Sequence, residues 1–139
     1  MKTSLVASMV AAALLAGCAS TLAKLNGPKL DYTEYAGEPV KSFYLGTGYD
    51  GWSAVSKDQF VLWSGINQAY LIKVTGYCPD LQFANTIAVT STANTVDKFE
   101  KVLVGHDRCF ISEIRPVDTK QMKEDRKLMR QQQEDSAKS

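Results

Sequence analysis

Short apolar runs separated by turn residues divide the chain between residues 41 and 75, and this pattern strongly limits the folds open to it. Tyr70, Ile72 and Val74, for example, recur with the two-residue period of a β-strand and are expected to share one face. The runs are rich in β-branched and aromatic residues and end at glycine or polar turn residues. Four strands, most of them half buried, are predicted over residues 41–46, 52–56, 59–65 and 69–75.

A change of period after Gly76 predicts a short helix within this β pattern. Pro79 fits the first turn of a helix, and Asp80 suits the positive end of its dipole. We therefore expect a short helix over residues 79–85 and a strand near 86–91.

Two longer runs that follow predict a β-hairpin. Residues 95–105 and 108–117 are expected to pair through a turn at Gly105-His106-Asp107. Pro116 has no amide hydrogen to donate to a neighbouring strand. The second strand is therefore expected to stop at Pro116 or to lie at an edge of its sheet.

The C-terminal residues have the pattern of a helix. Asp118 fits the N-cap position and Gln121 the capping-box position. The large apolar residues of this helix are only Met122, Leu128 and Met129, so most of it is expected to contact water. The full pattern predicts a mainly β fold: a small antiparallel barrel or roll of about six or seven strands, with one short internal helix and a C-terminal helix.

The first residues have the layout of a secretory signal. Lys2 supplies a positive charge, and the apolar run Leu5–Leu15 is too short to cross a bilayer, which needs roughly 20 residues. The ending Leu15-Ala16-Gly17-Cys18 resembles the lipobox of bacterial lipoproteins. That resemblance implies that the Cys18 thiol receives diacylglycerol, that the peptide is cut before it, and that the new amino group is acylated, for example with palmitate. Ala19, where Asp would favour the inner membrane, implies an outer-membrane lipoprotein facing the periplasm.

The signal divides the chain into four predicted parts. These are a removed signal peptide at 1–17, the lipidated cysteine and a tether at 18–40, a β domain at 41–118, and a C-terminal helix with a polar tail at 119–139. Without Lys2, 15 basic residues balance 15 acidic ones, so the side chains carry no net charge. A neutral chain has no electrostatic footprint for nucleic acid or for an anionic surface, so neither is an expected partner. The expected contacts are the membrane, through the N-terminal lipid, and an envelope protein.

Cys78 and Cys109 form an even pair in a chain expected to enter an oxidising compartment, so a disulfide is predicted. Closing a loop of about 30 residues would stabilise the fold by roughly 3 to 4 kcal/mol. A redox or metal-binding pair is the alternative, but the chain has no C-x-x-C spacing and a single histidine.

Several short motifs stand out from residue 35 onward. They are YAGEPVKSF (35–43), GW (51–52), VLW (61–63), AYL (69–71), C-x-D-L (78–81), A-x-x-I-A-V-T-S (84–91), FEKV (99–102) and C-x-I-x-E-I-R-P-V-D (109–118). Together they resemble an uncharacterised family of small proteobacterial lipoproteins, a domain of unknown function, over residues 35–118. The closing EIRPVD is the most specific part, whereas Glu100 stands where that family more often has Asp. The resemblance implies the domain limits, an envelope location and the Cys78–Cys109 pair, and it implies no activity.

No residue pattern predicts catalysis, a cofactor or a metal site. His106 is the only histidine and falls in a predicted turn beside Asp107, and Glu100 and Glu113 have no spacing that fixes a carboxylate pair. The run from Gly46 to Gly51 lies between predicted strands and opens no helix, so it is interpreted as a turn. The isolated acids Asp80, Asp97 and Asp107 form no metal-ligand motif. An envelope enzyme or enzyme inhibitor acting on cell-wall or periplasmic substrates remains the alternative function.

A binding or structural module of the envelope is the predicted function. The candidate interaction residues are Arg115, Glu113, Asp118 and Trp52. The Arg115 guanidinium suits bidentate recognition of a carboxylate, whereas in a structural role it would pair with Glu113 or cap the turn at Asp118. Large aromatic residues such as Trp52 either form an exposed recognition surface or fill a small core. No particular small-molecule ligand is indicated.

Overall fold

The computed structural model describes residues 30–139, so the predicted signal peptide, Cys18 and the predicted tether up to residue 29 lie outside the described residues. Leu30–Leu128 form one compact unit, here called the β unit. Met129–Ser139 are described only as the end of the C-terminal helix. The elements in chain order are η1 (Tyr32–Tyr35), β1 (Ser42–Tyr44), β2 (Gly51–Ala54), β3 (Gln59–Gly65), β4 (Gln68–Thr75), η2 (Pro79–Gln82), β5 (Ala88–Val89), β6 (Thr95–Asp97), β7 (Lys101–Val104), β8 (Asp107–Val117) and α2 (Thr119–Lys138).

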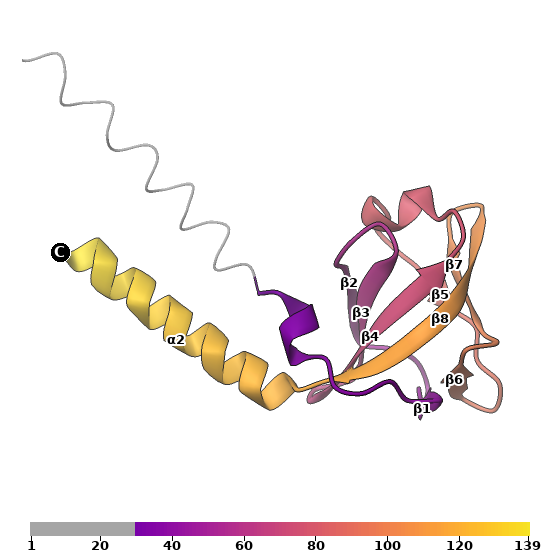
Figure 1. The fold of residues 1–139 in the computed structure, drawn as a ribbon, viewed down its shortest axis with the longest axis horizontal. Helices are drawn as coiled ribbons and strands as arrows, with labels where there is room; N and C mark the ends of the chain where they lie inside the picture. The colour runs from indigo at the N-terminus through magenta and orange to yellow at the C-terminus, as the bar shows by residue number, and fades with distance from the viewer. Residues whose placement is uncertain (1–29) are drawn as a thin grey trace, which may run out of the picture. The chain divides into compact units, whose positions relative to one another are not determined.

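Six of the eight strands form one antiparallel sheet that curls into a half-barrel (Figure 1). Its strand order is β2-β3-β4-β8-β7-β5, so β8 lies between β4 and β7. The remaining strands, β1 and β6, pair with each other in a second small sheet. The predicted mainly β fold with a rolled antiparallel sheet is therefore confirmed, with eight strands rather than six or seven.

The inner face of the curled sheet carries the hydrophobic core. Phe60, Ile72 and Ile114 stand side by side across β3, β4 and β8, and each is fully buried. Phe43 of β1 and Val96 of β6 belong to the same core cluster, so the small sheet packs on the inner side of the large one. Each such side chain contributes about 1.5 to 3 kcal/mol of hydrophobic stabilisation, which makes this layer the main source of stability.

The region after β4 is less regular than its sequence pattern predicts. The helix expected over residues 79–85 is a single 3-10 turn, η2, and the strand expected near 86–91 is limited to Ala88–Val89. The expected strand 95–105 is divided into β6 and β7. The Asp97 side chain accepts a hydrogen bond from the amide of Phe99 (2.7 Å), and its carbonyl accepts one from the amide of Glu100 (3.2 Å). This turn ends β6 and leaves it free to pair with β1.

Pro116 does not end β8, contrary to the prediction. The strand continues to Val117, and Pro116 stands opposite Tyr70 of β4. The Pro116 carbonyl accepts a hydrogen bond from the amide of Gly37 (2.8 Å), so its ring nitrogen also faces away from β4. The missing amide hydrogen therefore removes no bond between β8 and β4, and the residue is tolerated inside the strand.

Part of the predicted tether is bonded to the β unit. The amide of Asp118 donates to the carbonyl of Tyr35 (2.8 Å), and the amide of Val40 donates to the carbonyl of Ile114 (2.8 Å). The Tyr35 hydroxyl donates to the carboxylate of Asp125 in α2 (2.9 Å), which raises the pKa of Tyr35. Residues 35–40 therefore run along the C-terminal end of β8, and we call this segment the strap.

The start of α2 follows the predicted cap. The Asp118 carboxylate accepts a hydrogen bond from the amide of Gln121 (3.0 Å), as an N-cap does. Thr119 donates its hydroxyl to the carbonyl of Asn67 (2.8 Å), and Met122 is fully buried. Most later residues of the helix are exposed, as predicted. No helix within residues 30–139 has both the length and the apolar character needed to cross a membrane.

Candidate functional site

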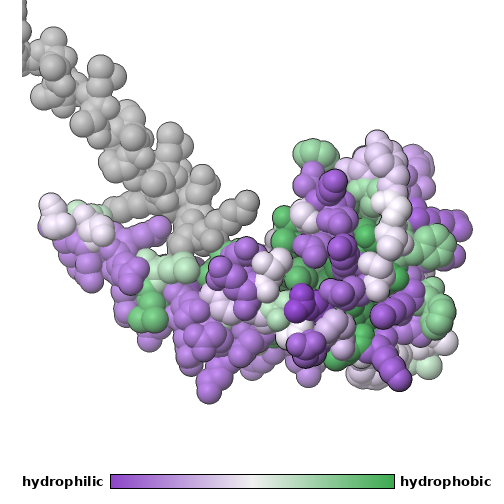
Figure 2. Space-filling view, in the orientation of Figure 1, coloured by the Kyte–Doolittle hydropathy of each residue, from purple (hydrophilic) through white to green (hydrophobic). Residues whose placement is uncertain are grey.

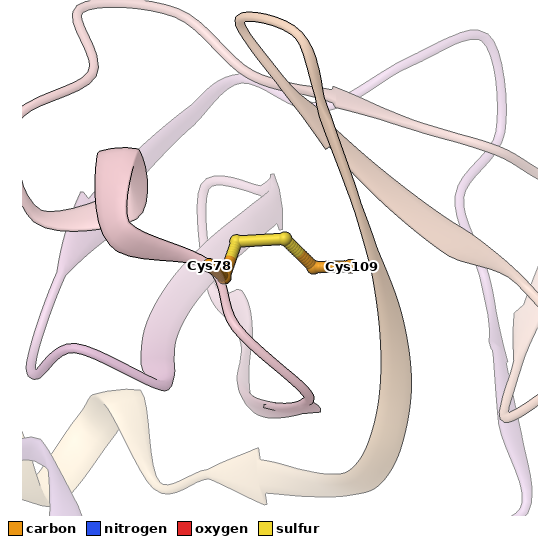
Figure 3. The surroundings of a disulfide bond; sticks show 2 residues. All are labelled: Cys78 and Cys109. Carbon is orange, nitrogen blue, oxygen red and sulfur yellow. A yellow bond between two sulfur atoms is a disulfide. The ribbon is translucent and has the colours of Figure 1, made fainter.

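A disulfide joins Cys78 to Cys109, as predicted from the cysteine pair. Figure 3 shows the two side chains meeting between the segment that leads into η2 and the strand β8. Both residues are buried in the core cluster, and their Cα atoms are 6.0 Å apart. Because the bond closes a loop between positions 31 residues apart, it should stabilise the β unit by about 3 to 4 kcal/mol.

Two exposed aromatic residues adjoin this disulfide in the chain. Phe110 follows Cys109, and since neighbouring strand residues face opposite sides, its ring lies on the outer face of the sheet, where it is 53% exposed. Tyr77 precedes Cys78 and is 88% exposed. Gly76, with a φ of +86°, turns the chain between the end of β4 and Tyr77, a conformation that other residues rarely adopt.

A third exposed aromatic residue precedes β7. The turn made by Asp97 presents Phe99 with 89% of its surface exposed. Phe110 stands between Thr75 of β4 and Lys101 of β7 in the sheet. Since β4 and β7 both run antiparallel to β8, Tyr77, two residues after Thr75, lies toward the N-terminal end of β8, and Phe99, two residues before Lys101, lies on the other side of Phe110. We call Tyr77, Phe99 and Phe110 the aromatic surface.

Basic side chains surround the aromatic surface. The ammonium group of Lys101 lies 5.1 Å from the centre of the Phe110 ring, within the range of a cation–π contact. By strand alternation, Lys73 and Arg108 also face outward around Phe110. Among the acidic residues of β4, β7 and β8, Glu113 alone faces outward, and it stands opposite Lys73. Glu100 precedes Lys101 and Asp107 precedes Arg108, so each basic side chain here has an acidic neighbour and this part of the sheet carries no excess of positive charge.

Glu100 is a buried carboxylate close to the aromatic surface in sequence. Thr90 and Thr92 donate their hydroxyl groups to its two oxygens, the second at 2.7 Å. These hydrogen bonds, with a smaller contribution from Lys101, hold the pKa of the Glu100 carboxyl below its usual value despite burial. Both oxygens are occupied, so Glu100 fixes the segment before β7 to the one after β5. It ties down the end of the turn that presents Phe99.

The four predicted interaction residues do not form one cluster. Trp52 packs against the core with its ring 6.4 Å from that of Phe60, in an edge-to-face arrangement. The Arg115 side chain donates from Nε to the carbonyl of Gly37 in the strap (2.7 Å), and Asp118 caps α2. Arg115 therefore holds the strap, in place of the expected pairing with Glu113 or Asp118. A further role of these residues in binding a partner stays a prediction.

His106 lies in the two-residue turn between β7 and β8 and is exposed. Gly105 precedes it with a φ of +57°, the feature of a type II′ hairpin turn. In the part of the chain that the structure describes, no three His, Cys, Asp or Glu residues lie close enough together to hold a metal ion.

Sequence reasoning missed Phe99 and Phe110. The signal for Phe110 was present, because Cys109 and Ile111 alternate with it and both are apolar residues expected to face inward. Phe99 lies within residues 95–105, which the sequence pattern predicts as one strand, so an exposed turn position was not expected there. Its exposure became visible only when the Asp97 turn divided that run.

Comparison with known proteins places the chain in a family. A family model described as "Family of unknown function (DUF6491)" matches residues 1–133. No curated protein and no solved structure matches the chain. The match covers the β unit together with most of α2 and the residues before residue 30. The chain with the exposed aromatic surface and the Cys78–Cys109 disulfide therefore belongs to this family of unknown function, DUF6491.

Proposed function

We propose that this protein is a proteobacterial lipoprotein, anchored through Cys18 to the outer membrane and facing the periplasm, and that its β unit is a binding module. The observation that carries the binding role is the aromatic surface, whose three rings are 53% to 89% exposed, with Tyr77 and Phe99 on either side of Phe110. Exposed aromatic groups that gather in one place are typical of interaction sites.

The rigidity of the fold beneath the aromatic surface supports this role. The disulfide fixes the residues next to Tyr77 and Phe110, and Glu100 fixes the residue next to Phe99. A surface held in place in the free protein loses little conformational entropy when it binds, so more of the contact energy appears as affinity.

The anchor is supported by the sequence Leu15-Ala16-Gly17-Cys18 and by the disulfide, which is typical of proteins exported to an oxidising compartment. Neither His106, exposed in a hairpin turn, nor Glu100, held by two hydroxyl groups, favours the alternative of an envelope enzyme.

The anchor is tested by membrane fractionation. Cys18→Ser should abolish the mass of the attached lipid and reduce the fraction that pellets with the envelope. Cys78→Ser/Cys109→Ser is a matched control, since it replaces the two other cysteines without touching the lipobox. A wild-type chain that carries no lipid by intact-mass measurement would refute the anchor.

The binding role is tested by hydroxyl-radical oxidation of the full chain in isolated envelopes. The rates of Tyr77 and Phe99 are compared with those of Tyr44 and Phe83, which are 66% and 82% exposed and lie outside the aromatic surface. Each rate is normalised to that of the same residue in the unfolded chain. Free in solution, Tyr77 and Phe99 should react at least as fast as their controls; in envelopes they should react more slowly if the aromatic surface is occupied. Unchanged ratios would refute the binding role.

A further inference from the structure

The curled sheet of the β unit has a seam between its two edge strands. The sheet ends at β2 on one side and at β5 on the other. Tyr49, two residues before β2, donates its hydroxyl to the carbonyl of Ile87, the residue before β5. We propose that this hydrogen bond, here called the latch, controls whether a thiol reagent reaches the buried Cys78–Cys109 disulfide. The inference is independent of the binding role proposed above.

The Ile87 carbonyl lies on the free edge of β5. The amide of Thr90 donates to the carbonyl of Lys101 beside β5 (2.9 Å), so the backbone groups of Thr90 face β7. In an antiparallel pair, successive residues alternate between facing the partner strand and facing away from it. Ile87, three residues before Thr90, therefore faces away from β7. The Tyr49 hydroxyl thus bonds where a neighbouring strand would pair in a closed barrel.

The disulfide lies behind β5. Val89 of β5 pairs with Val102 of β7, and Val102 pairs with Cys109 of β8, so these residues stand in one row across the sheet. Val102 and Cys109 are buried in the core cluster and Val89 packs against it, so the row faces inward. Cys78 is buried in the same cluster. Figure 2 shows a largely hydrophilic face of the β unit, as expected of a core that is closed to water.

β5 is the part of the sheet best suited to local opening. It has two residues, whereas β8 has 11. Its C-terminal side is held by Glu100, which accepts hydrogen bonds from the hydroxyl groups of Thr90 and Thr92. Its N-terminal side is held by the latch at Ile87. Because local opening costs less free energy where few contacts must break, loss of the latch should free this side of β5 before the longer strands.

The controlled reaction is thiol–disulfide exchange with an external dithiol, either a small molecule or a protein. One thiolate of the reagent attacks a cysteine sulfur, the Sγ–Sγ bond breaks, and the other cysteine leaves as a thiolate. The second thiol of the reagent then displaces the first cysteine from the mixed disulfide. Two electrons and two protons pass from the dithiol to Cys78 and Cys109, and the reagent becomes a cyclic disulfide.

The experiment measures how fast dithiothreitol reduces the disulfide in the folded full chain. Alkylation of Cys78 and Cys109 is followed by peptide mass. Tyr49→Phe keeps the ring and removes the latch, so it should be reduced about fivefold faster than the wild type, the factor expected for one typical hydrogen bond. Tyr70→Phe is the matched control, since it removes the hydroxyl of another ring packed on the core, stacked on Phe43. It should be reduced at the wild-type rate.

Unfolding of the whole β unit is the other route by which a reagent could reach the disulfide. Met122→Ala leaves a cavity at the start of α2 and lowers the stability of the whole fold. If the disulfide is reached through the seam, this variant should be reduced at nearly the wild-type rate. Faster reduction of Met122→Ala than of Tyr49→Phe would show that the reagent enters by global unfolding, and the proposal would be overturned.

Hydrogen exchange locates the opening. In Tyr49→Phe, the amides of Ala88 and Thr90, which face β7, should exchange about fivefold faster than in the wild type. The amide of Val40, bonded to Ile114 in the strap, should be unchanged. Equal reduction rates in Tyr49→Phe and the wild type would overturn the latch. Faster exchange confined to residues 76–83 would also overturn it, because the opening would then lie at η2.

Discussion

The two ends of β8 differ in what covers their outer face. Near its C-terminal end, Leu71 and Val117 face outward and are nevertheless 2% and 7% exposed. The strap and the first turns of α2 bond to this region, and Met122 is buried there. Near its N-terminal end, Phe110 and Tyr77 are 53% and 88% exposed, and Phe99, on the other side of Phe110, is 89% exposed.

This difference shows that outward-facing apolar residues of β8 and β4 are buried where the strap and the first turns of α2 pack over them. The last residues of α2 are polar and exposed, and nothing in their composition is suited to covering the aromatic rings. Uncovered aromatic groups beside the disulfide are therefore a distinct feature of the β unit.

The largest expected effect is at the uncovered end. Cys78→Ala/Cys109→Ala should lower the free energy of unfolding by about 3 to 4 kcal/mol, because the unfolded chain regains the entropy of an open loop. The melting temperature should fall by roughly 15 °C, measured by circular dichroism. Reduction of the wild-type protein should have the same effect, and a melting temperature that reduction leaves unchanged would show that the disulfide does not hold this end.

At the covered end, Met122→Ala should lower the free energy of unfolding by about 2 kcal/mol or more, since it leaves a cavity under α2. Leu128→Ala is the matched control on the same helix. Its side chain is 56% exposed, so the change should be within about 0.5 kcal/mol. Urea unfolding measures both. Equal effects would mean that α2 does not cover the sheet at Met122.

Glu100→Gln should cost about 1 to 2 kcal/mol at neutral pH, because two hydrogen bonds to a charged carboxylate become bonds to a neutral amide. The folded pKa of Glu100 is lowered, so its contribution is present above the unfolded pKa and is lost as the pH falls through the folded value. The wild-type protein should therefore lose more stability than the variant on acidification. Glu113→Gln makes the same chemical change at an outward-facing residue and is the matched control at neutral pH, where it should change the free energy of unfolding by less than about 0.5 kcal/mol.

The smallest expected effect is that of Phe99→Ser. With 89% of its surface exposed, this ring should contribute less than about 0.5 kcal/mol to the free energy of unfolding. A loss above about 1 kcal/mol in urea unfolding would show that Phe99 packs on the fold, and the contrast between the two ends of β8 would disappear.

Features that depend on neighbouring residues could be predicted from the sequence, whereas strand pairing between distant segments could not. Alternation placed β3 and β4 within a residue of their observed bounds, and the cap at Asp118 placed the start of α2. The pairing of β1 with β6 could not be predicted, because it joins strands about 50 residues apart and depends on the Asp97 turn. Because the Asp97 turn was not predicted, the exposure of Phe99 was not predicted either. Of the candidate site, the sequence predicted only the Cys78–Cys109 disulfide.

The strap sets where mechanical tension would enter the molecule. A pull on the chain before Leu30 passes through η1 to residues 35–40, which are hydrogen-bonded to Ile114, Pro116 and Asp118. The force therefore passes into β8, the longest strand, which pairs with β4 over seven positions and is tied to the loop before η2 by the disulfide. The edge strands β2 and β5 lie away from this route, so stretching the tether would strain the most firmly paired part of the sheet and spare its edges.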